Sequence, residues 1–451
     1  MKLNLTNIGP LKTAELDLSK KLIVFTGLNN SGKTYAAYII YGLYSLLRNN
    51  LEIFYFIDSG RSEKLIEDSS VEIDLLDYLE ITHDSFIDYM QTTLSKNLYK
   101  VFDTPHDFFQ NSEIHIINEP SSLFNSMIVS KAYKATLRIS ENVILNMEKS
   151  NDSSILKVQM ILEPGSAPEH DFVRFALNYE IYNLICSTYF ERVFTLPAER
   201  NAINIFFKQL SVEKNELLER IIHSRKDKNL NSDFKKPFGY PLPIKDSLDI
   251  AERLAQLKKE KSDFEYLALE LEKNILKGKI KVSENGEVQY SPNKSPIKNL
   301  DIHLTASMVK SLSNLVFYFR HLAQKGDFII FDEPELNLHP DNQILIARFL
   351  ARVVNEGFKV LISTHSDYII REFNALIMMN YNKEKVRDLM SEHKYDESSL
   401  LDYNLIGAYM FKGNTCQLLP IDELGFSVTS IDEAITKQSN ITEQIYSTLF
   451  E

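Results

Sequence analysis

The sequence has few cysteines, no long apolar run and no excess of positive charge. Only Cys186 and Cys416 occur in 451 residues, which excludes a disulfide framework and a zinc site built from several cysteines. No segment approaches the roughly 18 apolar residues expected of a membrane-spanning helix. The first residues, MKLNLTNIGP, lack a charged region followed by an apolar core and therefore predict no signal peptide. We expect a cytoplasmic protein without membrane contact.

The charge balance is acidic. Asp and Glu number 62 against 50 Lys and Arg, which gives a net charge of −12 and argues against a surface that coats nucleic acid nonspecifically. Short basic clusters permit a local nucleic-acid contact but do not indicate one, because such clusters are usually solvated faces. These clusters are Arg225–Lys228, Lys235–Lys236, Lys258–Lys261 and Lys277–Lys281.

Two apolar segments in the C-terminal half end in polar residues suited to chemistry. Residues 328–331 read FIIF, a buried-strand pattern that leads directly into Asp332 and Glu333. A second strand pattern, Lys359–Ser363, leads into Thr364-His365-Ser366. Taken singly, these residues fit a solvated turn and a helix cap. Ligands bind at the carboxyl edge of a parallel sheet, so together they predict a site there.

The N-terminal region contains a complete phosphate-binding motif. Residues 27–34, GLNNSGKT, match G-x-x-x-x-G-K-[ST], follow the apolar strand Leu22–Thr26 and open an apolar helix over Tyr35–Leu47. In such a loop the backbone N–H groups and the helix N-terminus surround phosphate oxygens. Lys33 is expected at the β- and γ-phosphates, and the Thr34 hydroxyl on magnesium. The expected ATP-binding residues are Gly27, Asn29, Asn30, Ser31, Gly32, Lys33 and Thr34.

A helix that begins near Ser307 is a further candidate. Ser307 stands where an N-cap is expected, a helix N-terminus attracts anions, and the helix runs to Leu322. A capped amphipathic helix without a ligand explains the same pattern. Its place just before the strand that ends in Asp332 favours a role in the site.

The middle of the chain predicts strands and helices of less specific character. Strand patterns cover Leu51–Ile57, Tyr133–Ile139 and Ile155–Leu162, the last two as part of an antiparallel meander. A strand at 193–196 ends in Pro197-Ala198-Glu199-Arg200. Either Glu199 and Arg200 form a local ion pair or, in the alternative, Arg200 is a nucleotide-site or subunit-contact arginine.

Further segments predict a helical insertion and two strand pairs. Residues 212–225 and 244–276 have helical periodicity, 278–290 form a hairpin through Asn285-Gly286, and 405–419 form a second strand pair. A closing helix is expected over Ile431–Phe450.

The combined motifs resemble the ABC-type ATPases of the RecF, SMC and OLD group. The segment DEPELNLHP at 332–340 is similar to the stand-alone prokaryotic AAA-type branch with an LHP motif, found in antiphage systems such as Septu, PARIS and Gabija. The resemblance implies an α/β fold, an ABC-type P-loop NTPase head with a mixed parallel sheet, an antiparallel β lobe and a helical insertion. The expected segments are 1–48 with the P-loop, 49–205 as the lobe, 206–277 as the insertion and 278–451 as the C-terminal part of the head.

The resemblance also implies roles for single residues. Thr34 and Asp332 would bind magnesium, Glu333 would be the base for the attacking water, and His365 the switch residue near the γ-phosphate. Residues 337–340 resemble the loop that touches a second subunit. Ser307 would reach the γ-phosphate of a partner's ATP, in a homodimer or higher oligomer that sandwiches nucleotide. The usual glycine after this serine is missing, and Lys310 is the candidate for the positive charge.

The expected function is a slow, magnesium-dependent ATPase acting as the regulatory or sensor subunit of a prokaryotic antiphage complex. OLD-like relatives continue into a TOPRIM nuclease, whereas only residues 372–451 follow Arg371 here, so a separate effector, a nuclease, is expected. A DNA-repair or chromosome-maintenance ATPase and a nucleotide-gated scaffold with negligible turnover are the alternatives.

Overall fold

A computed structural model describes residues 1–49, 53–117, 121–164, 168–206, 239–284, 286–296 and 299–450. These residues form two compact units. The first contains Met1–Asn4, Gly42–Asn97 and Ile114–Arg192, and the second contains Leu5–Tyr41, Leu98–Glu113 and Val193–Glu451. The expected segments 1–48, 49–205, 206–277 and 278–451 stay predictions. The two compact units do not test them, because each unit contains residues from several of these segments.

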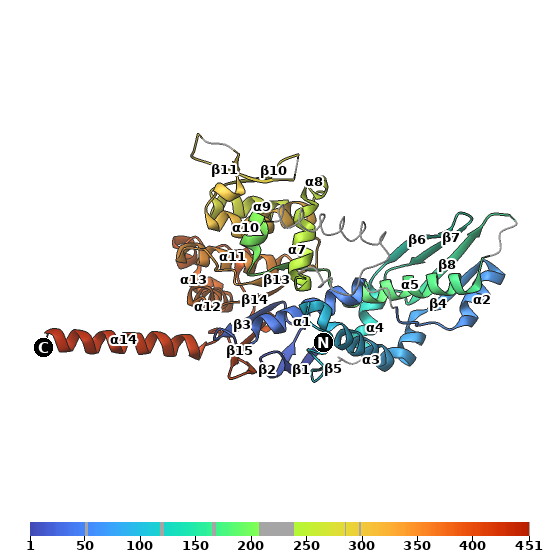
Figure 1. The fold of residues 1–451 in the computed structure, drawn as a ribbon, viewed down its shortest axis with the longest axis horizontal. Helices are drawn as coiled ribbons and strands as arrows, with labels where there is room; N and C mark the ends of the chain where they lie inside the picture. Colours follow the sequence, from blue (N-terminus) through green and yellow to red (C-terminus); the bar gives the residue numbers. More distant parts are fainter. Residues whose placement is uncertain are drawn as a thin grey trace, which may run out of the picture. The chain divides into compact units, whose positions relative to one another are not determined.

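The first unit is built on an antiparallel sheet with the strand order β4-β8-β7-β6. Buried and exposed residues alternate along β8, as expected for strands with one covered face. Figure 1 shows helix α5 running along this sheet, in green. The unit comprises α2 (Ser59–Asp68), β4 (Ser70–Asp74), α4 (Ser121–Ser130), β6 (Tyr133–Ser140), β7 (Val143–Lys149), β8 (Ile155–Leu162), α5 (His170–Tyr189) and parts of α1 (Lys33–Asn49), α3 (Leu75–Phe102) and β5 (Glu113–Ile117).

The expected antiparallel meander is confirmed, and strand β7 lies between its two expected strands, β6 and β8. The strand expected over Leu51–Ile57 is wrong for its described part, because residues 53–57 have no regular structure. The backbone N–H of Ile57 donates to Asn178 Oδ1 at 3.0 Å instead of to a neighbouring strand. The Phe54 and Phe56 rings pack on Phe86, so burial of these aromatic side chains explains the apolar pattern.

The second unit is organised around a mixed sheet in which strands from both ends of the chain are neighbours. Within this unit the order is β1-β2-β16-β15-β3-β14-β13-β9. Strands β15, β3, β14, β13 and β9 run parallel, with Asp332 opposite Ser363 and Ser363 opposite Phe25. In Figure 1 the blue strand β3 accordingly lies beside the orange β14. The α/β class with a mixed sheet is therefore confirmed.

The described part of this unit contains the following strands and helices. The strands are β1 (Lys2–Ile8), β2 (Leu11–Asp17), β3 (Leu22–Gly27), β9 (Val193–Leu196), β10 (Gly278–Val282), β11 (Val288–Pro292), β12 (Leu300–Asp301), β13 (Phe328–Asp332), β14 (Lys359–Ser363), β15 (Ile406–Lys412) and β16 (Thr415–Leu418). The α-helices are α7 (Leu242–Glu252), α8 (Leu254–Leu257), α9 (Glu265–Leu271), α10 (Ser307–Phe317), α11 (Pro340–Asn355), α12 (Asp367–Tyr381), α13 (Lys383–Glu392) and α14 (Thr429–Phe450). The π-helices are η1 (Glu272–Leu276) and η3 (Tyr318–Leu322), and the 3₁₀-helices are η2 (Ile302–Leu304), η4 (Glu397–Ser399) and η5 (Tyr403–Leu405).

The helix expected over Ile244–Leu276 is interrupted. Residues 258–264 are not helical, and Ser262 explains why this break is stable. Its hydroxyl donates to Ala323 O at 2.7 Å and accepts the N–H of Phe264 at 3.1 Å, so the side chain satisfies backbone groups that the helix would have used. Leu267 and Leu271 then join the main hydrophobic core of the unit. The other helical segment, 212–225, lies outside the described residues.

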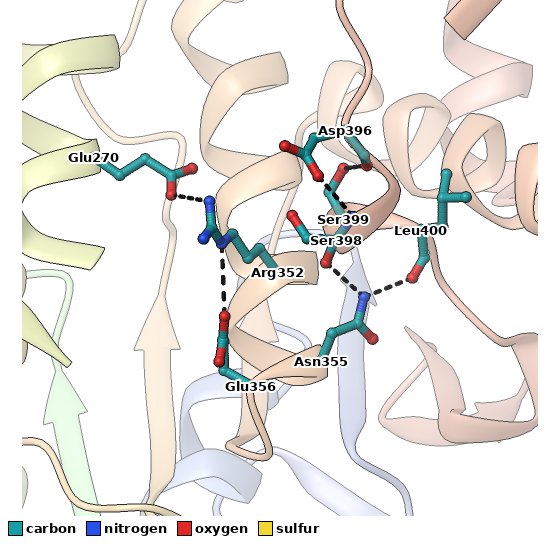
Figure 2. Close-up of polar contacts among 8 residues, drawn as sticks. All are labelled: Glu270, Arg352, Asn355, Glu356, Asp396, Ser398, Ser399 and Leu400. Carbon is teal, nitrogen blue, oxygen red and sulfur yellow. Dashed lines mark hydrogen bonds and ion pairs between the residues drawn. The ribbon is translucent and has the colours of Figure 1, made fainter. Parts of the chain in front are cut away.

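Polar contacts fix α11 to the elements beside it (Figure 2). Arg352 Nη1 binds Glu270 Oε2 at 2.7 Å, and Asn355 Nδ2 donates to Ser398 O at 2.8 Å and Leu400 O at 2.7 Å. Helix α11 begins at Pro340, the last residue of the motif segment 332–340. These contacts fix the C-terminal end of α11. In the part of the chain that the structure describes, no helix combines the length and apolar character needed to cross a membrane.

Candidate functional site

The phosphate loop adopts a conformation that requires its glycines. Strand β3 ends at Gly27, and helix α1 begins at Lys33. Gly27 has φ +120° and Gly32 has φ +98°, a region that side chains rarely adopt. A Cβ on Gly27 would lie 2.1 Å from the Phe411 carbonyl oxygen of the neighbouring strand β15. The loop therefore turns tightly against the sheet, and a side chain at Gly27 would displace it from β15.

Lys33 is held inside this loop. Its Nζ donates to Gly27 O at 3.1 Å and Leu28 O at 2.8 Å, and its side chain is buried. Burial lowers the pKa of Lys33, and the nearby carboxylates of Asp332, Glu333 and Glu335 oppose this shift. A buried ammonium group at a phosphate loop is a suitable partner for an anionic ligand.

Asp332 lies at the carboxyl end of β13 within reach of the loop. Its carboxylate accepts a hydrogen bond from the Ser363 hydroxyl, and its Oδ2 lies 3.4 Å from Thr34 Oγ1. Burial raises the pKa of Asp332, and the charge of Glu333 adds to this effect. A cation would compensate the buried charge. Among the described residues no group of three or more His, Cys, Asp or Glu could hold a metal. One carboxylate and one hydroxyl fit magnesium, which usually shares its coordination with phosphates and water.

Glu333 follows Asp332 in an unusual backbone conformation. Its φ is +48°, in the left-handed region that non-glycine residues rarely adopt. Its N–H donates to Ser363 O at 3.0 Å, and its carbonyl accepts a bond from Arg200 Nη2 at 2.6 Å. The chain therefore turns sharply at Glu333 while remaining bonded on both sides. Its half-buried side chain belongs to the same sheet edge as Asp332.

His365 is placed at this edge by a carboxylate that the sequence analysis did not single out. Glu335 Oε1 accepts the backbone N–H of His365 at 2.7 Å, and Oε2 accepts the Thr364 hydroxyl at 2.9 Å. Burial and the charge of Lys33 lower the pKa of His365 to about 4, so the imidazole is neutral near pH 7. The only sequence signal for Glu335 was a third carboxylate in the same turn.

Ser307 and Lys310 lie on helix α10. Ser307 is the first residue of α10 and is exposed, and Ala306 occupies the N-cap position expected for it. Among the contacts of the described residues, none joins either side chain to the phosphate loop. Helix α10 instead contacts the segment after β9, where Asn204 Nδ2 donates to Lys310 O at 2.6 Å. Arg200, whose role the sequence left open, is buried in the same region.

A separate cavity of about 470 Å³ contains none of these residues. It lies among α9, η1, α11 and residues 394–399, and Glu270, Arg352, Asp396, Ser398 and Ser399 of its lining appear in Figure 2. Two of its arginines already have acidic partners, since Arg352 binds Glu270 and Arg348 binds Glu372, each at 2.7 Å. The sheet edge around Lys33, Asp332 and His365 is therefore the better candidate for the functional site.

Comparisons with known proteins identify the family of the chain. A family model described as an AAA ATPase domain matches residues 1–370. A search of curated proteins gave no significant match.

Similar solved structures include an SMC head bound to the C-winged helix domain of ScpA, with TM-score 0.33, 10% identity and coverage of 93% of this chain and 96% of that chain. The SMC head domain from Thermotoga maritima has TM-score 0.30 and 11% identity over 93% of this chain and 98% of that chain. An Smc head from Pyrococcus furiosus, bound to the C-terminal domain of ScpA, also has TM-score 0.30 and 11% identity, over 97% of this chain and 98% of that chain. The family match spans most of the sequence and includes the phosphate loop, Asp332, Glu333 and His365. The chain belongs to the AAA ATPase domain family.

Proposed function

We propose that the chain binds ATP with magnesium and hydrolyses it slowly at the carboxyl edge of its parallel strands. The observation that carries this proposal is the convergence of a phosphate loop, the adjacent carboxylates of Asp332 and Glu333, and His365 on adjoining strands. These residues come from positions about 300 apart in the chain, and only the fold brings them together.

The proposed roles follow from charge and position. The Gly27–Thr34 backbone, with the side chains of Asn29, Asn30 and Ser31, surrounds the phosphates, and the Lys33 ammonium exchanges its loop carbonyls for phosphate oxygens. Thr34 and Asp332 hold magnesium, which would neutralise charge on the β- and γ-phosphates.

Water activation is assigned to Glu333. Phosphoryl transfer depends mainly on positioning and electrostatic stabilisation, and a carboxylate orients the attacking water and accepts its proton. His365 is neutral near pH 7, so it can donate one hydrogen bond toward the γ-phosphate without competing with Lys33 for charge.

A second copy of the chain would complete the site. Ser307 is exposed at the start of α10, where a helix N-terminus can meet the γ-phosphate of a partner's ATP, and Lys310 lies one turn along the same helix. Residues 337–340 would touch the other subunit. Hydrolysis would then depend on association into a homodimer or higher oligomer.

In the cell we propose a cytoplasmic regulatory or sensor subunit of an antiphage complex that controls a separate effector, a nuclease. Support for this role is the resemblance of the 332–340 segment to the LHP branch, an analogy and not a geometric argument. No nuclease activity of the chain itself is proposed. A repair or chromosome-maintenance ATPase and a nucleotide-gated scaffold with negligible turnover are the competing functions.

Light scattering with parallel phosphate-release assays tests the proposal on wild type and Glu333→Gln. We expect wild type to release phosphate slowly and to associate with ATP and magnesium. Glu333→Gln should bind ATP, remain associated and lose about 100-fold or more in turnover. A constant mass with rapid turnover would contradict nucleotide-controlled assembly. ATP-dependent assembly without phosphate release would favour the scaffold.

A further inference from the structure

Arg200 is a fully buried charged side chain that the roles above do not use. It follows β9 in the segment Pro197-Ala198-Glu199-Arg200, and its exposed fraction is 0%. Burial lowers its pKa to about 10, so the guanidinium remains charged at neutral pH. A buried charge requires partners, and the identity of those partners indicates what the residue does.

The guanidinium of Arg200 joins three separate segments. Nη1 donates to Asp332 O at 2.7 Å and Pro197 O at 3.0 Å, and Nη2 donates to Glu333 O at 2.6 Å. Nε donates to Ser311 Oγ, on helix α10, at 2.8 Å. The group also lies over the Phe331 ring, 4.9 Å from its centroid. A planar fork can bind two successive carbonyls and a hydroxyl at once, whereas the single ammonium of lysine cannot reproduce this geometry.

These bonds act on the backbone turn that sets the direction of the Glu333 side chain. A left-handed conformation is unfavourable for a non-glycine residue, so the turn at Glu333 needs support from its surroundings. On one side, the Glu333 N–H is held by Ser363 O at 3.0 Å. On the other, Arg200 holds the carbonyls of both Asp332 and Glu333.

The same side chain connects this turn to α10. Ser311 is fully buried one turn after Ser307. Asn204 binds the same helix separately, by donating to Lys310 O at 2.6 Å and to Ser313 Oγ at 3.1 Å. A shift of the helix would therefore act on the Arg200 guanidinium and, through it, on the Glu333 backbone.

We propose that Arg200 is a positioning residue for ATP hydrolysis, which fixes the direction of Glu333 relative to helix α10. This inference rests on the proposed function, because it assigns water activation to Glu333. Arg200 thereby links Glu333, which activates water, to helix α10. The first residue of this helix, Ser307, is expected to meet the ATP of a second copy. Arg200 itself touches neither ATP nor water in this assignment.

Steady-state kinetics and ATP binding by calorimetry test this on Arg200→Lys, Ser311→Ala and the matched control Ser313→Ala. Ser311 and Ser313 are both buried on α10, but only Ser311 bonds to Arg200. We expect Arg200→Lys to lower kcat by about 10-fold or more and Ser311→Ala by about 3-fold or more, with ATP affinity changed less than about 3-fold. Ser313→Ala should keep the wild-type kcat, even where its unfolding temperature falls as far as that of Ser311→Ala.

The outcomes separate this inference from the proposed function. Phosphate release by wild type combined with an unchanged kcat in Ser311→Ala and Arg200→Lys overturns the inference alone. Equal losses of kcat in Ser311→Ala and Ser313→Ala also overturn it, since they indicate a general effect on helix packing. No phosphate release by wild type overturns both. If Arg200→Lys does not fold, the comparison of Ser311→Ala with Ser313→Ala decides.

Discussion

The Glu335 carboxylate holds His365 by its main chain and not by its ring. Oε1 accepts the His365 N–H at 2.7 Å, while Oε2 accepts the hydroxyl of the preceding Thr364 at 2.9 Å. Burial raises the pKa of Glu335, and these hydrogen bonds favour its charged form. The turn after β13 therefore determines where the end of β14 presents its histidine.

Glu335→Ala should release this segment and reduce turnover. We expect kcat to fall about 10- to 100-fold, because a misplaced group at a reacting centre is costly, while ATP affinity stays within about 3-fold. Glu335→Gln keeps the shape and one acceptor oxygen and should lose less. Phosphate release and calorimetry on both variants check this. Equal turnover of Glu335→Ala and wild type would show that the placement of His365 does not limit hydrolysis.

Lys33→Ala should weaken ATP binding by about 100-fold or more, because it removes the buried ammonium group that meets the phosphates. Lys20→Ala is the matched control, since its Nζ also donates to a backbone carbonyl, Asn404 O at 2.8 Å, but at an exposed site outside the phosphate loop. Calorimetric titration with ATP and magnesium distinguishes the two. Micromolar binding retained by Lys33→Ala would contradict the assignment of the phosphate loop.

Gly27→Ala should damage both stability and nucleotide binding. Gly27 and Gly413 both have positive φ, +120° and +60° respectively. A Cβ added at Gly27 would lie 2.1 Å from the Phe411 carbonyl oxygen, whereas a Cβ added at Gly413 would have no atom within 4 Å. Gly413→Ala should therefore cost about 1 kcal/mol of unfolding free energy from backbone strain alone. Thermal unfolding and ATP titration should show a larger loss for Gly27→Ala, together with weaker binding. Similar losses in both variants would mean that the loop can move away from β15.

The sequence predicted the parts of the site that depend on local patterns. Apolar runs located β3, β13 and β14, and the loop glycines with Asp332, Glu333 and His365 were singled out because each lies at the end of one of these strands or shortly after it. Arg200 and Glu335 were not assigned because their roles depend on partners in other segments, and no local pattern shows that a side chain will bind a distant carbonyl. The same reason explains why the break at 258–264 was missed, since it depends on Ser262 bonding to Ala323.

A nuclease within this chain is not expected. Purified protein incubated with plasmid DNA and magnesium or manganese should leave the DNA intact. The control is the double variant Asp332→Ala with Glu333→Ala, which removes the proposed ATPase carboxylates. Cleavage by wild type that persists in this variant would reveal a second catalytic site.

The shifted pKa of His365 predicts a pH dependence of stability that one substitution should remove. The folded-state pKa, about 4, lies below the ordinary value of 6.5, so between these values the unfolded chain binds a proton that the folded chain does not. His365 therefore lowers the free energy of unfolding as pH falls from about 6.5 toward 4, and contributes no such loss above that window. Because the ring is only half-buried, solvent reduces the size of the effect.

His365→Gln cannot titrate, so its unfolding temperature should fall less between pH 7 and pH 5 than that of wild type. Thermal unfolding without nucleotide at both pH values measures the difference, and His303→Gln, at an exposed histidine, is the matched control. We expect the control to follow the wild-type pH dependence. If His365→Gln follows it as well, the histidine is not held in its neutral form. Because the His365 ring is neutral, it and the Lys33 ammonium can approach the same phosphate without repelling each other. A His365→Gln variant with the wild-type pH dependence would therefore also remove the physical basis for His365 as the switch residue.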